Sequence, residues 1–209
     1  MKVIVFGATG TLGRIVCQQL SEEGHDVTAF ARRAPGDAED RPHIRFVAGD
    51  AMDEDAVSAA VQGHDAVVVT LGAGMKRNTP IRSQGTLNVI RAMQKHGVKR
   101  LICQSTLGAH ESWSNLNFFW KRIMFGGLLR PVFRDHELQE QLVQASGLDW
   151  TIVRPSAFDK APATGRFREN FGPDEARLTL KIPLADIAAF LSRQLNDMRY
   201  LHRAVGISN

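Results

Sequence analysis

The chain has 209 residues, of which 44% are hydrophobic, 23% charged and 7% aromatic. This length suits one domain with a full hydrophobic core, and this composition excludes a disordered or fibrous protein. The formal net charge of +4 comes from scattered Lys and Arg residues without interleaved aromatic side chains, which argues against nucleic-acid binding and is compatible with an anionic small ligand.

Membrane insertion and secretion are not expected. No apolar run reaches the roughly 18 to 20 residues that cross a bilayer, and the chain opens on a strand pattern instead of a signal peptide. Cys17 and Cys103 lie in apolar contexts without metal-ligand spacing, so we expect two reduced, buried thiols and no metal site. We therefore expect a cytoplasmic protein, and the oligomeric state stays open.

Strand patterns and helix patterns alternate along the chain. Short apolar runs rich in β-branched residues predict strands over 2–6, 26–32, 44–49, 65–71, 99–105 and 149–155. Helical periodicity predicts helices over 11–23, 53–61, 80–96 and 134–146, each followed by a glycine suited to end it, at Gly24, Gly63, Gly97 and Gly147.

The C-terminal part of the chain continues the alternation, with a strand and a helix within 178–195 and a last strand at 203–208. Together the elements predict an α/β fold: a doubly wound, Rossmann-like parallel sheet in one domain spanning 1–209. Ligands of such sheets bind at the carboxyl ends of the strands, and we expect residues from about 155 to 209 to cover the substrate side.

Three glycines join the first predicted strand to the first predicted helix. Gly7, Gly10 and Gly13 form the pattern G-x-x-G-x-x-G. The first two let the backbone turn tightly and approach a pyrophosphate, and Gly13 lets the helix pack closely on the sheet. In this strand–turn–helix context the pattern predicts dinucleotide binding.

The end of the second predicted strand indicates which dinucleotide is preferred. An NAD-binding unit usually carries a carboxylate there, but this chain has Arg32 and Arg33. A guanidinium can bind a 2′-phosphate, so we expect NADP(H) to be preferred over NAD(H), unless the arginines are only solvated residues at a strand end. Asp50, just past the third strand, could accept a hydrogen bond from adenine or cap the next helix.

Several features with matching order and spacing carry a family resemblance over nearly the whole chain. They are "FGATGTLG", Arg32, "AGDAMDEDAVSAAVQGHDAVVVTLG", "SQGTLNVIRAMQKHGVKRLICQST", "RDHELQEQLVQASGLDWTIVRP" and "APATGRF". With them the chain resembles the atypical short-chain dehydrogenases with an NmrA-like, NAD(P)H-binding domain, above all the biliverdin-IXβ reductases, also called flavin reductases. The glycine turn is general to that superfamily, whereas its combination with "RDHE" and "APATG" is much more specific.

The resemblance implies roles for individual residues. The implied contacts are Gly7, Thr9, Gly10, Thr11 and Leu12 to the pyrophosphate; Arg32 to the 2′-phosphate; Asp50 and Ala51 to the adenine; Leu71 and Gly72 to the nicotinamide-side ribose; and Cys103 and Ser105, with His136 close by, to the nicotinamide end. The related reductases have a histidine where this chain has Ala157. That departure weakens the expectation of a bilin substrate more than that of the fold or cofactor.

The catalytic pair of ordinary short-chain dehydrogenases is missing. The single tyrosine, Tyr200, has no lysine four residues later, so a Tyr-x-x-x-Lys mechanism of carbonyl reduction is not expected. Acceptors that spread the incoming charge over a conjugated ring need a positioned acid less. Ser105 and His136 are candidate catalytic residues, although each could instead be a local capping group.

The stretch 107–135 gathers six aromatic residues, Trp113, Phe118, Phe119, Trp120, Phe125 and Phe133. It could roof a flat ligand, pack as a plain helix, or dock another protein. The sequence therefore predicts an NADPH-dependent oxidoreductase that passes hydride to a flavin, quinone or bilin-like acceptor. The alternative is an NmrA-like regulator that senses NAD(P) without turnover.

Overall fold

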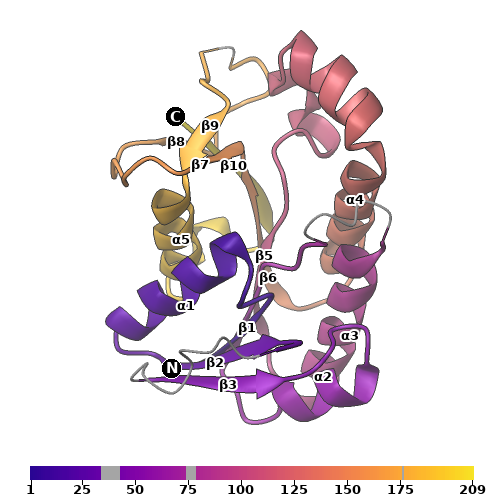
Figure 1. Cartoon of the computed structure of the whole chain (residues 1–209), viewed down its shortest axis with the longest axis vertical. Coiled ribbons are helices and arrows are strands. Elements are labelled where there is room, and N and C mark those ends of the chain that lie inside the picture. Colours follow the sequence, from indigo (N-terminus) through magenta and orange to yellow (C-terminus); the bar gives the residue numbers. More distant parts are fainter. Residues whose placement is uncertain (34–42, 74–78, 176) are drawn as a thin grey trace.

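The computed structural model describes residues 1–33, 43–73, 79–175 and 177–209. Its main sheet contains the strands β1 (Lys2–Phe6), β2 (Asp26–Ala31), β3 (Ile44–Ala48), β4 (Ala66–Val69), β5 (Arg100–Gln104), β6 (Asp149–Pro155), β8 (Arg168–Glu169) and β10 (Arg203–Ser208). They lie in the order β3-β2-β1-β4-β5-β6-β10-β8 (Figure 1). All neighbours are parallel except β8, which runs antiparallel to β10. This order confirms the predicted doubly wound fold.

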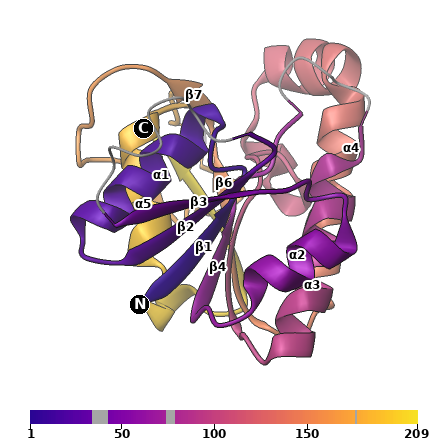
Figure 2. The ribbon, with the colours of Figure 1, turned by 60° about the horizontal axis from the view of Figure 1, so that its bottom comes forward.

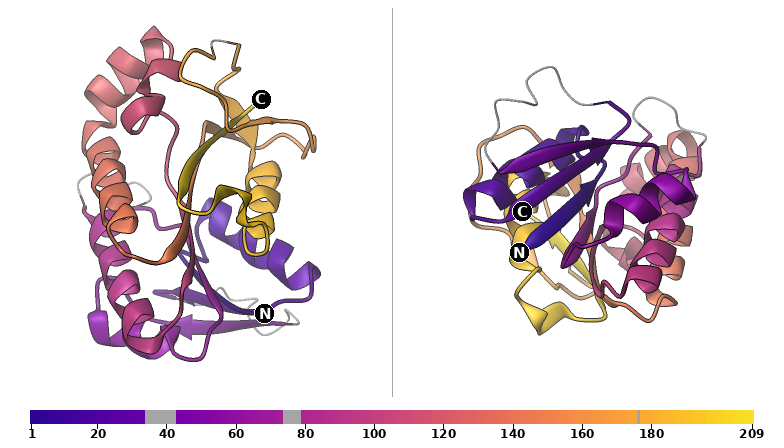
Figure 3. Two further views of the ribbon diagram at one scale, coloured as in Figure 1. Left: turned by 180° about the vertical axis from the view of Figure 1, so that it is seen from behind. Right: turned by 90° about the horizontal axis from the view of Figure 1, so that it is seen from below.

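Helices cover both faces of the sheet, so the fold has three layers. On one face α1 (Thr11–Glu22) packs against α5 (Leu184–Arg193), and on the other lie α2 (Glu54–Val61), α3 (Ile81–His96) and α4 (Arg130–Gln144), as Figures 2 and 3 show. A small parallel pair, β7 (Ala157–Asp159) and β9 (Lys181–Pro183), lies apart from the main sheet. None of the helices in the described ranges is both long enough and apolar enough to span a membrane.

The alternation of side chains along each strand divides the core in two. On β1, Val3 and Val5 belong to the cluster beneath α1 and α5, whereas Ile4 and Phe6 belong to the cluster beneath α2, α3 and α4. All four side chains are fully buried. A strand that is apolar on both faces must be covered on both faces, so the sequence of β1 already requires this arrangement.

The four helix-ending glycines behave as the sequence predicts. Gly24, Gly63, Gly97 and Gly147 all adopt positive φ angles between 68° and 82°, a conformation that favours glycine. The stretch 107–135 is more helical than a loop: the 3₁₀ helix η2 (His110–Asn115) and the π-helix η3 (Phe119–Leu128) lead directly into α4. The helix α4 begins at Arg130, four residues earlier than predicted. Pro131 does not prevent this, because it sits in the first turn, where proline is tolerated.

Candidate functional site

A cleft of about 970 Å³ opens at the carboxyl ends of the strands. It lies where the chain order of the sheet reverses, since β1 has β2 on one side and β4 on the other. Its walls extend from the glycine turn to the helices of the stretch 107–135. The lining residues come from the ends of strands β1 to β6, from the turns that follow them and from the starts of α1 and β7. They include Gly7, Thr9, Gly10, Thr11, Leu12, Arg32, Asp50, Ala51, Leu71, Gly72, Ser105, Ala157 and Phe158.

The glycine turn at one end of the cleft leaves no room for side chains. Gly7 has a φ of +84°, and a Cβ atom there would lie 2.5 Å from the carbonyl oxygen of Thr70. A Cβ atom on Gly13 would overlap the Gly7 carbonyl oxygen. The helix α1 that follows has neither a side-chain cap nor an acidic residue in its first turn. Its N-terminal amides therefore face the cleft as a site suited to a pyrophosphate.

The residues predicted for the nucleotide part mostly line the cleft. Arg32 is exposed at the end of β2 and forms part of the wall, whereas Arg33, also exposed, does not. The Asp50 carboxylate accepts a hydrogen bond from the backbone of Met52 at 3.0 Å. The alternative role of Asp50 as a helix cap is taken by Asp53, which accepts from two backbone amides of α2.

Cys103 lies in the core and not in the cleft wall. Its side chain is fully buried, and both this burial and the charge of Glu140 raise the pKa of the thiol. The neutral thiol is a poor nucleophile and a poor metal ligand. Its burial confirms the prediction from its apolar context, and its place at the nicotinamide end stays a prediction.

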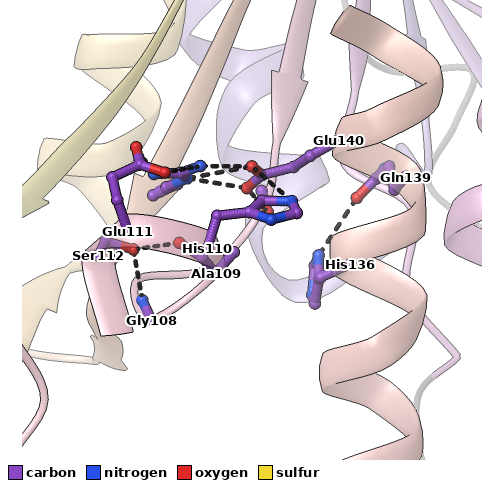
Figure 4. A network of polar contacts seen from close by, with 10 residues as sticks. Gly108, Ala109, His110, Glu111, Ser112, His136, Gln139 and Glu140 are labelled. Carbon is purple, nitrogen blue, oxygen red and sulfur yellow. Dashed lines mark hydrogen bonds and ion pairs between the residues drawn. The ribbon is translucent and has the colours of Figure 1, made fainter. Parts of the chain in front are cut away.

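Ser105 lines the cleft with its hydroxyl committed to a buried carboxylate. Its Oγ donates to Oε1 of Glu140 at 2.5 Å, and Arg154 donates to both oxygens of the same carboxylate at 2.6 to 3.2 Å (Figure 4). Glu140 is fully buried and Arg154 is only 2% exposed. Arg154 also pairs at 2.5 Å with Glu111, which is on η2. Because the Ser105 proton points to Glu140, the hydroxyl offers the cleft only its lone pairs.

Contacts with two carboxylates stabilise the positive charge of the buried Arg154. Burial alone would lower the pKa of Arg154, but hydrogen bonds and the negative charges of Glu140 and Glu111 raise it. A buried ion pair of this kind needs further hydrogen bonds to offset its desolvation, and Ser105 supplies one of them. Glu140 therefore acts as the acceptor that fixes the Ser105 side chain.

His136 also lines the cleft, and it is neutral. Burial lowers its pKa to about 3, and the charge of Arg82 acts in the same direction. Its Nδ1 lies 3.2 Å from Oε1 of Gln139 (Figure 4). The amide nitrogen of Gln139 donates to Thr86. The carbonyl side of Gln139 therefore faces the ring, Nδ1 carries the proton, and Nε2 is an acceptor.

The aromatic stretch forms the far wall of the cleft. Trp120 and Phe125 of η3 line it together with Leu129 and Val132, and Phe158 of β7 also belongs to the cleft wall. Phe125 stacks on Phe133 with ring centroids 4.8 Å apart. The outer surface of the same segment carries four exposed apolar side chains, Phe118, Phe119, Ile123 and Leu128.

Sequence reasoning missed several residues of this site. Arg154 could have been noticed as a charge within the apolar strand "DWTIVRP", because a buried charge needs a partner. That partner, Glu140, lies on a different element, and no local pattern identifies it. Arg82 and Gln104 also line the cleft, and their positions near the ends of α3 and β5 become meaningful only in the folded chain.

Comparisons with known proteins agree with this geometry. A family model described as NAD(P)H-binding matches residues 7–198, which confirms the resemblance found in the sequence. A Bacillus subtilis (strain 168) relative described as the uncharacterized sugar epimerase YhfK is 27% identical, over 79% of this chain and 76% of its own.

Two solved structures share the fold across 100% of this chain. The anaerobilin reductase ChuY from Escherichia coli O157:H7 is 23% identical, with a TM-score of 0.82 and 97% of its chain covered. A short-chain dehydrogenase/reductase from Veillonella parvula DSM 2008, solved in complex with NADP, is 15% identical, with a TM-score of 0.82 and 94% of its chain covered.

Proposed function

Because this chain belongs to the NAD(P)H-binding family, we propose that it is an NADPH-dependent reductase that passes hydride to a conjugated acceptor. The observation that carries the proposal is one continuous cleft that joins the glycine turn to the aromatic wall of η3. Its volume of about 970 Å³ lies at the upper end of the range of ligand pockets, which suits a dinucleotide with a second ligand beside it.

The cofactor part of the proposal rests on the backbone of the turn. Gly7, Gly10, Thr11 and Leu12 would hold the pyrophosphate at the N-terminus of α1, and Arg32 would bind the 2′-phosphate. Asp50 and Ala51 would border the adenine. The bound nicotinamide supplies a hydride, and the residues of this chain bind and orient it.

The acceptor part rests on what the polar residues of the cleft can donate. The Ser105 hydroxyl donates its hydrogen bond to Glu140, and the Nδ1–H of His136 donates to Gln139. Neither group is arranged as a general acid toward the cleft. An acceptor whose conjugated rings spread the added charge needs no such acid, and the flat aromatic wall suits its shape.

Flavins and quinones fit the proposal better than bilins. Ala157 occupies a cleft position where the resembling reductases have a histidine, so a polar contact to the acceptor is lost. The similarity to an anaerobilin reductase keeps bilins among the acceptors to be tested. We expect FMN, riboflavin or a quinone to be reduced faster than biliverdin.

The test is NADPH oxidation at 340 nm with FMN, riboflavin, menadione and biliverdin under anaerobic conditions. Turnover that is faster with flavin or quinone supports the proposal, and efficient turnover of biliverdin alone would correct the acceptor. Binding of NADPH without oxidation by any of the four would instead favour the dinucleotide-sensing alternative.

A further inference from the structure

The wall of the cleft contains a largely buried arginine whose hydrogen bonds to the described residues are incomplete. Arg82 is the second residue of α3 and lines the cleft, and its side chain is only 13% exposed. Its Nε is buried without a hydrogen-bond partner among the described residues. Burying a charged donor is costly unless its hydrogen bonds are satisfied. An arginine in this state is typical of a site that a ligand completes.

The acid nearest to Arg82 is already engaged elsewhere. Asp135 lies 3.7 Å from the Arg82 guanidinium, which is longer than a hydrogen bond. Its carboxylate instead accepts from the backbone amides of Arg82 and Ser83 at 3.0 Å each and from the Ser83 hydroxyl at 2.5 Å. Asp135 thus caps the N-terminus of α3 from a different helix. It balances the Arg82 charge but leaves the guanidinium donors to the cleft.

Arg82 lies in the cleft wall next to the turn that follows β4. A Cβ atom on Gly72 would lie 3.7 Å from Nη2 of Arg82, so the guanidinium faces the turn after β4. His136 lines the same cleft close enough to feel the Arg82 charge, and its ring is neutral and so does not compete for an anion. Among the described residues of the cleft wall, Arg82 and Arg32 are the two lysine or arginine side chains, on α3 and β2 respectively.

We propose that Arg82 is an anion-binding residue, whose guanidinium receives a phosphate or carboxylate oxygen of the ligand bound between β4 and α4. A planar guanidinium binds such oxygens with paired, charge-assisted hydrogen bonds, which are strong in a cleft shielded from water. The anion comes either from the cofactor or from the acceptor. This inference rests on the proposed function only in that the cleft holds these two ligands.

The test compares Arg82→Met with wild type in equilibrium titrations that require no turnover. Arg91→Met is the matched control, because Arg91 is on the same helix, its side chain is 52% exposed, and it pairs with Glu54 away from the cleft. One arm titrates NADP⁺ alone. The other arm uses acceptor pairs that differ in charge, FMN against riboflavin and biliverdin against its dimethyl ester.

A tenfold to hundredfold loss of NADP⁺ affinity in Arg82→Met, by the usual strength of a charge-assisted hydrogen bond, assigns the anion to the cofactor. A tenfold to hundredfold loss of affinity for FMN or biliverdin in Arg82→Met, with the affinities for riboflavin and the ester unchanged, assigns the anion to the acceptor. Arg82→Lys keeps the charge without the planar fork and should lose roughly threefold to tenfold. It serves as the second variant should Arg82→Met fold poorly.

Unchanged affinities in folded Arg82→Met and Arg82→Lys for every ligand that the wild type binds would overturn the proposal. A wild-type protein that binds these ligands through Arg82 yet never oxidises NADPH would instead contradict the proposed function and leave the anion site standing. The two failures are therefore distinguishable.

Discussion

The two ends of the cleft are built in opposite ways. At the end proposed to hold the nucleotide, the chain supplies backbone: Gly7 and Gly13 remove side chains, and no described side chain caps α1. At the end proposed to hold the acceptor, it supplies side chains that bind one another, since Asp135 caps the N-terminus of α3 and Glu140 binds both Ser105 and Arg154. The N-termini of α1 and α3 both border the cleft. The backbone amides of α1 have no side-chain acceptor among the described residues, whereas those of α3 donate to Asp135.

The difference shows where each half of the site is encoded. A binding site made of backbone depends on a few neighbouring residues, so a short stretch of the sequence is enough to specify it. A side-chain network depends on residues such as Ser105, Glu140 and Arg154 that the fold brings together. Mutations should therefore separate the halves, since those at the nucleotide end change binding and those at the acceptor end first change stability.

The largest effect is expected from Glu140→Gln, which leaves Arg154 without its fully buried partner charge. We expect the free energy of unfolding in urea to fall by about 3 to 5 kcal/mol. The matched control is Glu54→Gln, because the Glu54–Arg91 pair is more than half exposed on both sides and should contribute no more than about 1 kcal/mol. Equal small losses in both variants would show that the buried network does not stabilise the fold.

The next effect concerns the glycine turn. Gly7→Ala combines a positive φ with overlap against Thr70, so we expect about 2 to 4 kcal/mol of lost stability and at least a tenfold loss of NADPH affinity. Gly24→Ala has nearly the same φ, +82°, but no atom within 4 Å of the added Cβ, and should cost about 1 to 2 kcal/mol without affecting NADPH. Equal behaviour of the two would mean that close backbone approach is unimportant.

The third effect is a pH dependence. The pKa of His136 is lowered from 6.5 to about 3 in the folded protein, so between these values the unfolded state binds the extra proton. The stability that the neutral ring contributes is present above pH 6.5 and is lost as the pH falls. Between about pH 7 and about pH 4.5 wild type should lose about 2 to 3 kcal/mol more than His136→Asn. Parallel urea-stability curves for the two proteins would contradict the buried, neutral histidine.

The smallest effect is expected from Arg32→Ala, because that side chain is exposed at the end of β2. NADPH affinity should fall roughly tenfold to hundredfold while NADH affinity barely changes, since only NADPH carries the 2′-phosphate. Calorimetric titration at low and moderate salt measures this, and added salt should reduce the difference. If the variant loses NADH affinity equally, Arg32 has only a structural role.

The same contrast explains what could be predicted from the sequence. The sheet, its helices and the glycine turn follow from periodicity and from φ requirements that Gly7, Gly24 and Gly97 meet locally. The state of Ser105 could not be predicted, because it depends on Glu140 of a different element. That of His136 depends on Gln139 of the same helix, which is oriented by Thr86 of α3. The burial of Cys103, in contrast, follows from its apolar context in the sequence and is confirmed.

The central claim is that NADPH and a conjugated acceptor share one cleft and exchange hydride directly. The most direct measurement is a single turnover of enzyme-bound NADPH mixed anaerobically with the fastest acceptor of the panel, followed at 340 nm and repeated with NADPH deuterated at either face of C4. We predict a decay that is slowed by deuterium at one face only, with that deuterium absent from the NADP⁺ product and deuterium at the other face retained. Tight NADPH binding with no decay, or deuterium lost equally from both faces, would contradict the claim.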